Sequence, residues 1–260
     1  MTFQPVLPLG GYAGWRFLSR TLPQQQAAFV QSAPVQRATD YFKANIAKAT
    51  TAEALVKDRR LLEVALGAYG LKDDLNSRAF IQKVLEGGTT DPKALGSRLA
   101  DKRYATLARE FGYGDLGARV GLKGFADKII ARYEAQAFQE AVGAKDDNMR
   151  LALNLPSALA EVAGATANPR AQWFSVMGNP PLRAVFERAL GLPKTFAALD
   201  IDQQLGQLQA RSEAVFGTAR VDGFADPARQ EKLVRLFLLR SDAQATGASP
   251  AAMALQLLRR

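Results

Sequence analysis

The side chains available for chemistry in this chain are carboxylates, lysines, tyrosines, serines and arginines, because its 260 residues include no histidine and no cysteine. Histidine is the side chain that titrates nearest neutral pH, and histidine and cysteine are the commonest ligands of zinc. A Ser-His-Asp triad, a Cys-His pair, a zinc finger, a CxxC redox motif and an iron-sulfur cluster cannot be built from this chain alone. We predict a protein that is not an enzyme, with no catalytic residue and no cofactor. An enzyme that uses only carboxylates or lysines is the less favoured alternative.

Two pairs of adjacent carboxylates are the remaining candidates for a metal site or for general acid-base catalysis. They are Asp73-Asp74 and Asp146-Asp147. Each pair follows a glycine that ends one apolar segment and precedes the next, a position where negative charge stabilises a helix N-terminus. Helix capping is therefore the favoured role of both pairs, and no metal site is predicted.

Basic residues near the C-terminus are candidates for an anion-binding face. The net charge of the chain is +9. Nucleic acid or another anionic surface could bind a basic face formed by Arg235, Arg240, Arg259 and Arg260. The sequence contains no dense run of lysine and arginine interleaved with aromatic residues. A solvated basic surface is therefore favoured, and nucleic-acid binding is the alternative.

The most unusual local segment lies near the N-terminus and reads PLGGYAGWRFL from Pro8 to Leu18. Its glycines let the backbone adopt positive φ angles, and its Tyr, Trp, Arg and Phe side chains are types found at interface hot spots. One interpretation is a site that binds another protein, formed by Gly10, Gly11, Tyr12, Gly14, Trp15, Arg16 and Phe17. The other is a segment whose Trp15 and Phe17 pack on the protein's own core. The sequence leaves both open.

The elements that must position these residues are predicted to be helices. Several prolines directly follow a residue that can cap a helix, as at Asp91-Pro92, Asn168-Pro169, Asn179-Pro180, Asp226-Pro227 and Ser249-Pro250. Thr50 and Glu53 have the spacing of a capping box. Glycines come directly after many of the apolar segments, as they do at helix C-termini.

The apolar spacing between these signals is also helical. Phe125, Ile129 and Tyr133 recur at intervals of four residues, whereas no stretch of alternating β-branched residues indicates a strand. We predict an all-α protein, an irregular bundle or array of about ten or more short helices with no significant sheet. Pro156 is expected to kink or end its helix.

Three regions are expected along the chain. Residues 1–32 form an N-terminal arm and a first helix, residues 33–165 a helical domain, and residues 166–260 a C-terminal helical subdomain packed on the first. A single domain is the alternative. No uncharged apolar run of about 18 residues is present, so we predict a soluble protein that does not insert into a membrane.

Five segments distributed along the chain carry a family resemblance. They read PLGGYAGWRFLSRT, DRRLLEVALGAYGL, DKRYATLAREFGYGD, DNMRLALNL and GNPPLRAVFERALGLP. Together they resemble a bacterial family of helical proteins, domain-of-unknown-function family 1217 (DUF1217). Its members are often encoded among flagellar genes, and some carry the name of a basal-body rod protein. The resemblance implies a role associated with the flagellum and supplies no catalytic residues.

The rod-protein name fits this chain poorly. Axial flagellar proteins pair their terminal helices through coiled-coil heptads, and Pro5, Pro8 and the nearby glycines are unfavourable in heptads. We therefore expect a non-enzymatic accessory factor that binds another protein, such as a flagellar component. It would act in the cytoplasm or at the flagellum after export without a cleaved signal. The sequence leaves its oligomeric state open.

Overall fold

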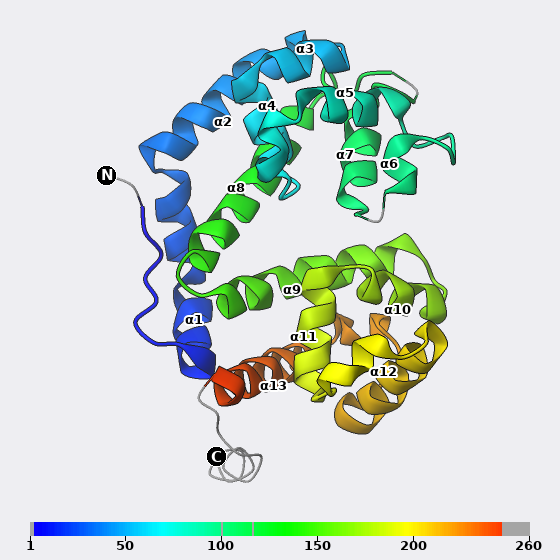
Figure 1. The fold of residues 1–260 in the computed structure, drawn as a ribbon. Coiled ribbons are helices and arrows are strands. Elements are labelled where there is room, and N and C mark those ends of the chain that lie inside the picture. The colour runs from blue at the N-terminus through cyan, green and yellow to red at the C-terminus, as the bar shows by residue number, and fades with distance from the viewer. Residues whose placement is uncertain (1–2, 100, 116, 246–260) are drawn as a thin grey trace. The chain divides into compact units, whose positions relative to one another are not determined.

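The computed structural model describes residues 3–99, 101–115 and 117–245 of the chain. In these residues the regular secondary structure is entirely helical, which confirms the all-α prediction (Figure 1). The α-helices are α1 (Gly11–Val30), α2 (Ala33–Asn45), α3 (Ala52–Lys57), α4 (Arg59–Gly67), α5 (Arg78–Gly87), α6 (Leu95–Arg98), α7 (Arg103–Phe111), α8 (Phe125–Gly143), α9 (Asp147–Ala165), α10 (Pro169–Met177), α11 (Pro180–Leu190), α12 (Ile201–Phe216) and α13 (Pro227–Ala245). Short 3-10 helices are η1 (Ile46–Lys48), η2 (Lys72–Asn76), η3 (Lys194–Ala198) and η4 (Asp222–Ala225).

Most of the helix starts predicted from capping residues are confirmed. The side chains of Asn168 and Asn179 accept backbone N–H groups at the starts of α10 and α11, and Asp226 does so at the start of α13. At Asp91-Pro92 the prediction is wrong, because Asp91 accepts the N–H of Lys93 within a turn and α6 begins later. Ser249-Pro250 lies outside the described residues.

Two other local predictions need correction. The cap of α3 is Thr51, which accepts the N–H of Ala54 at 3.1 Å, rather than Thr50. Pro156 does not end a helix, since α9 continues through it from Asp147 to Ala165. Buried leucines on both sides of the proline, Leu151 and Leu159, hold the two halves of α9 against the core, and packing outweighs the unfavourable propensity.

The chain packs as two compact units, and α1 contributes to both. The first unit contains Met1–Pro5 and Thr21–Ala141, and the second contains Val6–Arg20 and Val142–Arg260. The boundaries expected from the sequence, at 32/33 and 165/166, lie elsewhere. The reason is that α9 packs with α10, α11 and α13, so its residues belong with the C-terminal helices.

The core of the first unit combines packed helices with contacts between aromatic rings. Helix α4 packs on α2 and α3, and α5 packs on α3, α6 and α7. Phe29, Phe138 and Phe3 bring their rings together, with Phe29 and Phe138 5.6 Å apart in an edge-to-face arrangement. Such pairs stabilise a core beyond the burial of their area.

The second unit is organised around α11, which packs against α9, α10, α12 and most extensively α13. Its core contains a row of edge-to-face aromatic rings that joins Trp173, Phe186, Phe224 and Phe216, with each neighbouring pair of centroids 5.2 Å apart. Trp173 also donates its indole N–H to the carbonyl of Ala219 at 2.7 Å, so its polar edge is satisfied when buried.

Candidate functional site

The N-terminal arm, defined here as Val6–Arg20, is part of the second unit. Its glycines open helix α1: Gly11 has a φ of +59°, and the N–H of Gly14 donates to the carbonyl of Gly10 at 3.1 Å. The segment from Gly11 onward is therefore a helix rather than a flexible loop, and its side chains have fixed directions.

Two of these glycines are required by close packing. A Cβ added at Gly11 would collide with the carboxylate of Asp242 on α13. A Cβ at Gly14 would collide with the backbone carbonyl of Leu9 and would lie 2.9 Å from the Cε of Met149. The glycines therefore let the start of α1 approach α9, α13 and the segment before it.

The two aromatic residues at the start of α1 share one carboxylate on α13. The hydroxyl of Tyr12 donates to Oε1 of Glu231 at 2.8 Å, and the indole N–H of Trp15 donates to Oε2 at 3.3 Å. Burial and then the hydrogen bond to Glu231 raise the pKa of Tyr12. Trp15 is 8% exposed. Glu231 therefore holds the arm to the second unit through both of its oxygens.

The residues predicted to bind a partner divide between inward and outward positions. Gly11, Gly14 and Trp15 are buried, Tyr12 and Phe17 are half-buried, and Gly10 and Arg16 are exposed. The arm thus packs on its own unit through Trp15, as the second interpretation of the sequence expects. Its outward side is the part that another molecule can reach.

The outward side of the arm includes two aliphatic residues that the sequence analysis missed. Val6 is 54% exposed and Leu9 is 58% exposed, and Arg16 and Arg20 are exposed on the following helix. We call these four residues the arm surface. Prolines at 5 and 8 indicate that Val6-Leu7-Pro8-Leu9 lies outside a helix, but nothing in the sequence indicates which of these side chains are exposed.

The basic face predicted near the C-terminus is partly engaged within the second unit. The guanidinium of Arg235 lies 5.8 Å from the ring centroid of Tyr12. Arg240 donates to the carbonyl of Ala189 in the last turn of α11, and burial, followed by the charge of Arg211, lowers its pKa. Arg259 and Arg260 lie outside the described residues. Arg240 therefore satisfies a helix end, as cations near C-terminal carbonyls do.

Each acidic pair contains a carboxylate that accepts a hydrogen bond. Asp146 caps α9 by accepting the N–H of Met149 at 3.1 Å, which confirms the predicted role. Asp74 instead accepts the hydroxyl proton of Tyr104 at 2.6 Å. Burial and this hydrogen bond raise the pKa of Tyr104 to about 12. Within the described residues, no three carboxylates come together in a group that could hold a metal ion.

No helix in the described part of the chain is both long enough and apolar enough to cross a membrane.

The chain matches a protein family in sequence and a solved structure in fold. A family model described as "Protein of unknown function (DUF1217)" matches residues 68–229. The crystal structure of protein AGR_C_984 from Agrobacterium tumefaciens is similar, with a TM-score of 0.73 and 24% sequence identity over 93% of this chain and 99% of that one. This likeness concerns the fold. A search of curated proteins found no match.

Proposed function

The chain belongs to the DUF1217 family, and from this premise and the geometry of the arm we propose that it is a non-enzymatic accessory factor that binds another protein. The observation that carries the proposal is the exposure of Val6 and Leu9 on a segment anchored by Glu231. Aliphatic side chains held outward on a fixed backbone lose little entropy when they are buried by a partner.

The composition of the arm surface indicates the kind of partner. Val6 and Leu9 offer apolar area, and Arg16 and Arg20 lie four residues apart on α1 with exposed side chains. A complementary surface would have an apolar centre and acidic residues at its edge. A component of the bacterial flagellum is the proposed partner, because the family resemblance of the sequence implies a role associated with the flagellum.

Removing the whole arm would be a poor test of this function. Trp15 and Leu18 are buried in the second unit, so a chain that lacks residues 1–20 loses part of its core. Substitution of exposed residues avoids this difficulty. The variant Val6→Asp/Leu9→Asp places two charges on the arm surface and leaves the bonds to Glu231 intact.

The experiment is affinity capture from the native cell with identification of the captured proteins by mass spectrometry. We expect flagellar components with the unmodified chain and their loss with Val6→Asp/Leu9→Asp. Ile201→Asp is the matched control, because Ile201 is 55% exposed in the same unit but lies outside the arm. If the arm variant captures the same flagellar components, the arm is not the binding site. Capture without any flagellar component contradicts the flagellar role.

A further inference from the structure

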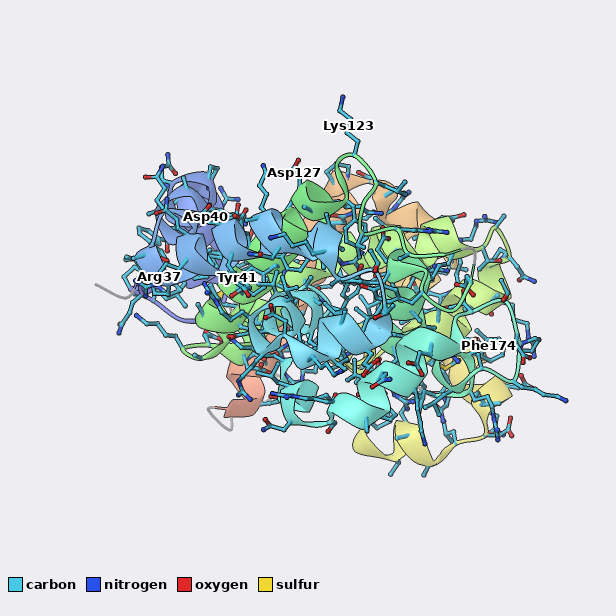
Figure 2. The ribbon with its side chains drawn as sticks, turned by 90° about the horizontal axis from the view of Figure 1, so that it is seen from above. Arg37, Asp40, Tyr41, Lys123, Asp127 and Phe174 are labelled. Carbon is cyan, nitrogen blue, oxygen red and sulfur yellow. The ribbon has the colours of Figure 1, made fainter. Side chains whose placement is uncertain are left out.

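The segment between α7 and α8, in the first unit, presents a leucine and a lysine to solvent. Leu122 is 62% exposed, and Lys123 projects away from the neighbouring helices (Figure 2). Two consecutive turns fix the backbone here, since the N–H of Leu122 donates to the carbonyl of Arg119 at 3.0 Å and the N–H of Phe125 donates to that of Leu122 at 3.1 Å. Val120 and Phe125 are buried on either side. We call Leu122 and Lys123 the tip, and it is presented in a fixed position.

Lys123 has no counter-charge within the described residues. No ion pair or hydrogen bond to its ammonium group occurs there, whereas Lys128, one turn into α8, pairs with Glu110 at 2.6 Å. An exposed leucine beside an uncompensated cation is a surface that an apolar site with a carboxylate would complement.

The same unit contains an apolar groove with a carboxylate in it. The groove lies between the second half of α1 and α8 and has a volume of about 180 Å³. Its lining consists of Gln26, Phe29, Val30, Ala131, Glu134, Ala135 and Phe138. Glu134 is half-buried and, in the part of the chain that the structure describes, no side chain pairs with it. Burial raises the pKa of its carboxyl, because the charged form is poorly solvated there.

We propose that this groove binds the tip of a second copy of the chain, with Leu122 in the apolar groove and Lys123 paired with Glu134. The sizes agree, since a cavity of roughly 150 Å³ holds a benzene molecule and the groove is slightly larger than this. The charges also agree, because the ammonium group of Lys123 in one copy can pair with the carboxylate of Glu134 in the other.

A second copy is required because one chain cannot reach its own groove. The tip directly precedes α8, and Glu134 lies nine residues beyond Phe125 on the same helix. At 1.5 Å per residue, α8 holds Phe125 and Glu134 about 14 Å apart, so the tip before Phe125 cannot reach Glu134 of the same chain. Contacts between copies close into a dimer if they are reciprocal, and they extend into a chain of copies if they are not.

Sedimentation of the full-length chain over a dilution series tests the proposal. We expect concentration-dependent self-association that Leu122→Ser weakens by about ten- to a hundredfold, because a buried leucine side chain contributes a free energy of that size. Ile201→Ser is the control, since Ile201 is a similarly exposed aliphatic residue in the other unit. A chain that is monomeric at every concentration overturns the proposal.

Charge exchange tests the pairing itself. Lys123→Glu and Glu134→Lys each place like charges at the proposed contact, so each variant alone should be monomeric. In an equimolar mixture every contact between unlike variants joins opposite charges, and association should return. The double variant Lys123→Glu/Glu134→Lys should also associate by itself.

The control for charge is Lys83→Glu, on the exposed side of α5 in the same unit. It should associate as the unmodified chain does, and all variants should keep the helical content and melting temperature of the unmodified chain. If the mixture of Lys123→Glu and Glu134→Lys remains monomeric while the unmodified chain associates, the contact between copies lies elsewhere and the proposal fails. These outcomes are independent of the arm surface, which belongs to the other unit.

Discussion

Two glycine-rich segments resemble each other in sequence and differ in structure. The arm contains three glycines within Gly10–Gly14, and the segment before α8 contains three within Gly117–Gly124. At Gly11 and Gly14 an added Cβ would collide with Asp242 or the backbone of Leu9, whereas at Gly117, Gly121 or Gly124 it would meet no atom within 4 Å. The first segment is thus packed and the second is open.

The comparison teaches that glycine serves two different needs in this protein. In the arm it removes volume so that helices can approach. Before α8 glycine allows positive φ angles, which are +107° at Gly117 and +82° at Gly124. Both segments expose aliphatic side chains. Exposure is therefore set by the conformation of the backbone and does not require a flexible segment.

The largest contrast should result from adding one methyl group to each segment. Gly14→Ala gains about 1 kcal/mol of helix propensity, but the collision with Leu9 and Met149 forces a shift that costs about 3 kcal/mol. We expect a net loss of about 2 kcal/mol in the free energy of unfolding, measured by chemical denaturation. Gly121→Ala should change it by less than about 0.5 kcal/mol. Equal effects of the two substitutions would show that the arm is not packed.

Removal of the anchor of the arm should have an effect of similar size. Glu231→Ala leaves the indole N–H of Trp15 and the hydroxyl of Tyr12 without their acceptor, and we expect a loss of about 1–3 kcal/mol. Tyr12→Phe removes one of the two bonds and should cost about 0.5–1.5 kcal/mol. Thermal melts of both variants measure the difference. If Tyr12→Phe is as destabilising as Glu231→Ala, the hydrogen bond from Trp15 to Glu231 does not contribute to stability.

At the base of the open segment, Asp115 provides a pH-dependent contribution. Its carboxylate accepts the N–H groups of Thr89 and Thr90 at 2.6 and 3.0 Å and the hydroxyl of Thr89 at 3.1 Å. Burial raises the pKa of Asp115, but these hydrogen bonds outweigh burial and lower it below the ordinary value.

Because the folded pKa is lowered, the stabilisation from Asp115 is complete above the unfolded pKa of about 3.9 and is lost as the pH falls through the folded value. Asp115→Asn should therefore destabilise the chain by about 1 kcal/mol at neutral pH and by progressively less as the solution is acidified below about pH 4. Denaturation of both proteins at a series of pH values measures this. A difference that grows on acidification would contradict the assigned role.

The smallest effects should come from the exposed aliphatic residues that the two segments share. Leu9→Ser and Leu122→Ser remove side chains that are more than half exposed, so the stability of a single, unassociated copy should change by less than about 0.5 kcal/mol. Melting curves at high dilution measure this. A large loss for either variant would mean that the side chain belongs to the core.

The fold class and many helix starts could be predicted because they depend on local signals. Asn168, Asn179 and Asp146 cap their helices through bonds that span three residues or fewer. The prediction failed at Asp91-Pro92, where the same local pattern forms a turn. A cap and a turn use the same side-chain geometry, and a helix continues from it only when the later residues find a core to pack on.

The candidate site was less accessible to sequence reasoning. The arm is unusual in sequence, but its two interpretations differ in whether Trp15 faces inward, and nothing near Trp15 in the sequence indicates Glu231. Likewise, no local pattern indicates that Val6 and Leu9 are exposed or that Arg240 bonds to the end of α11. Each of these features joins residues that are far apart in the chain or depends on exposure after folding.

The sequence by itself determined that this protein is helical and that it contains neither histidine nor cysteine for catalysis or metal binding, because composition and spacings of three and four residues are local properties. The tertiary structure alone decided which glycine-rich segment is packed and which is open, and which aliphatic and charged side chains are left exposed. Steric fit and burial depend on atoms brought together from distant parts of the chain, so no local pattern specifies them.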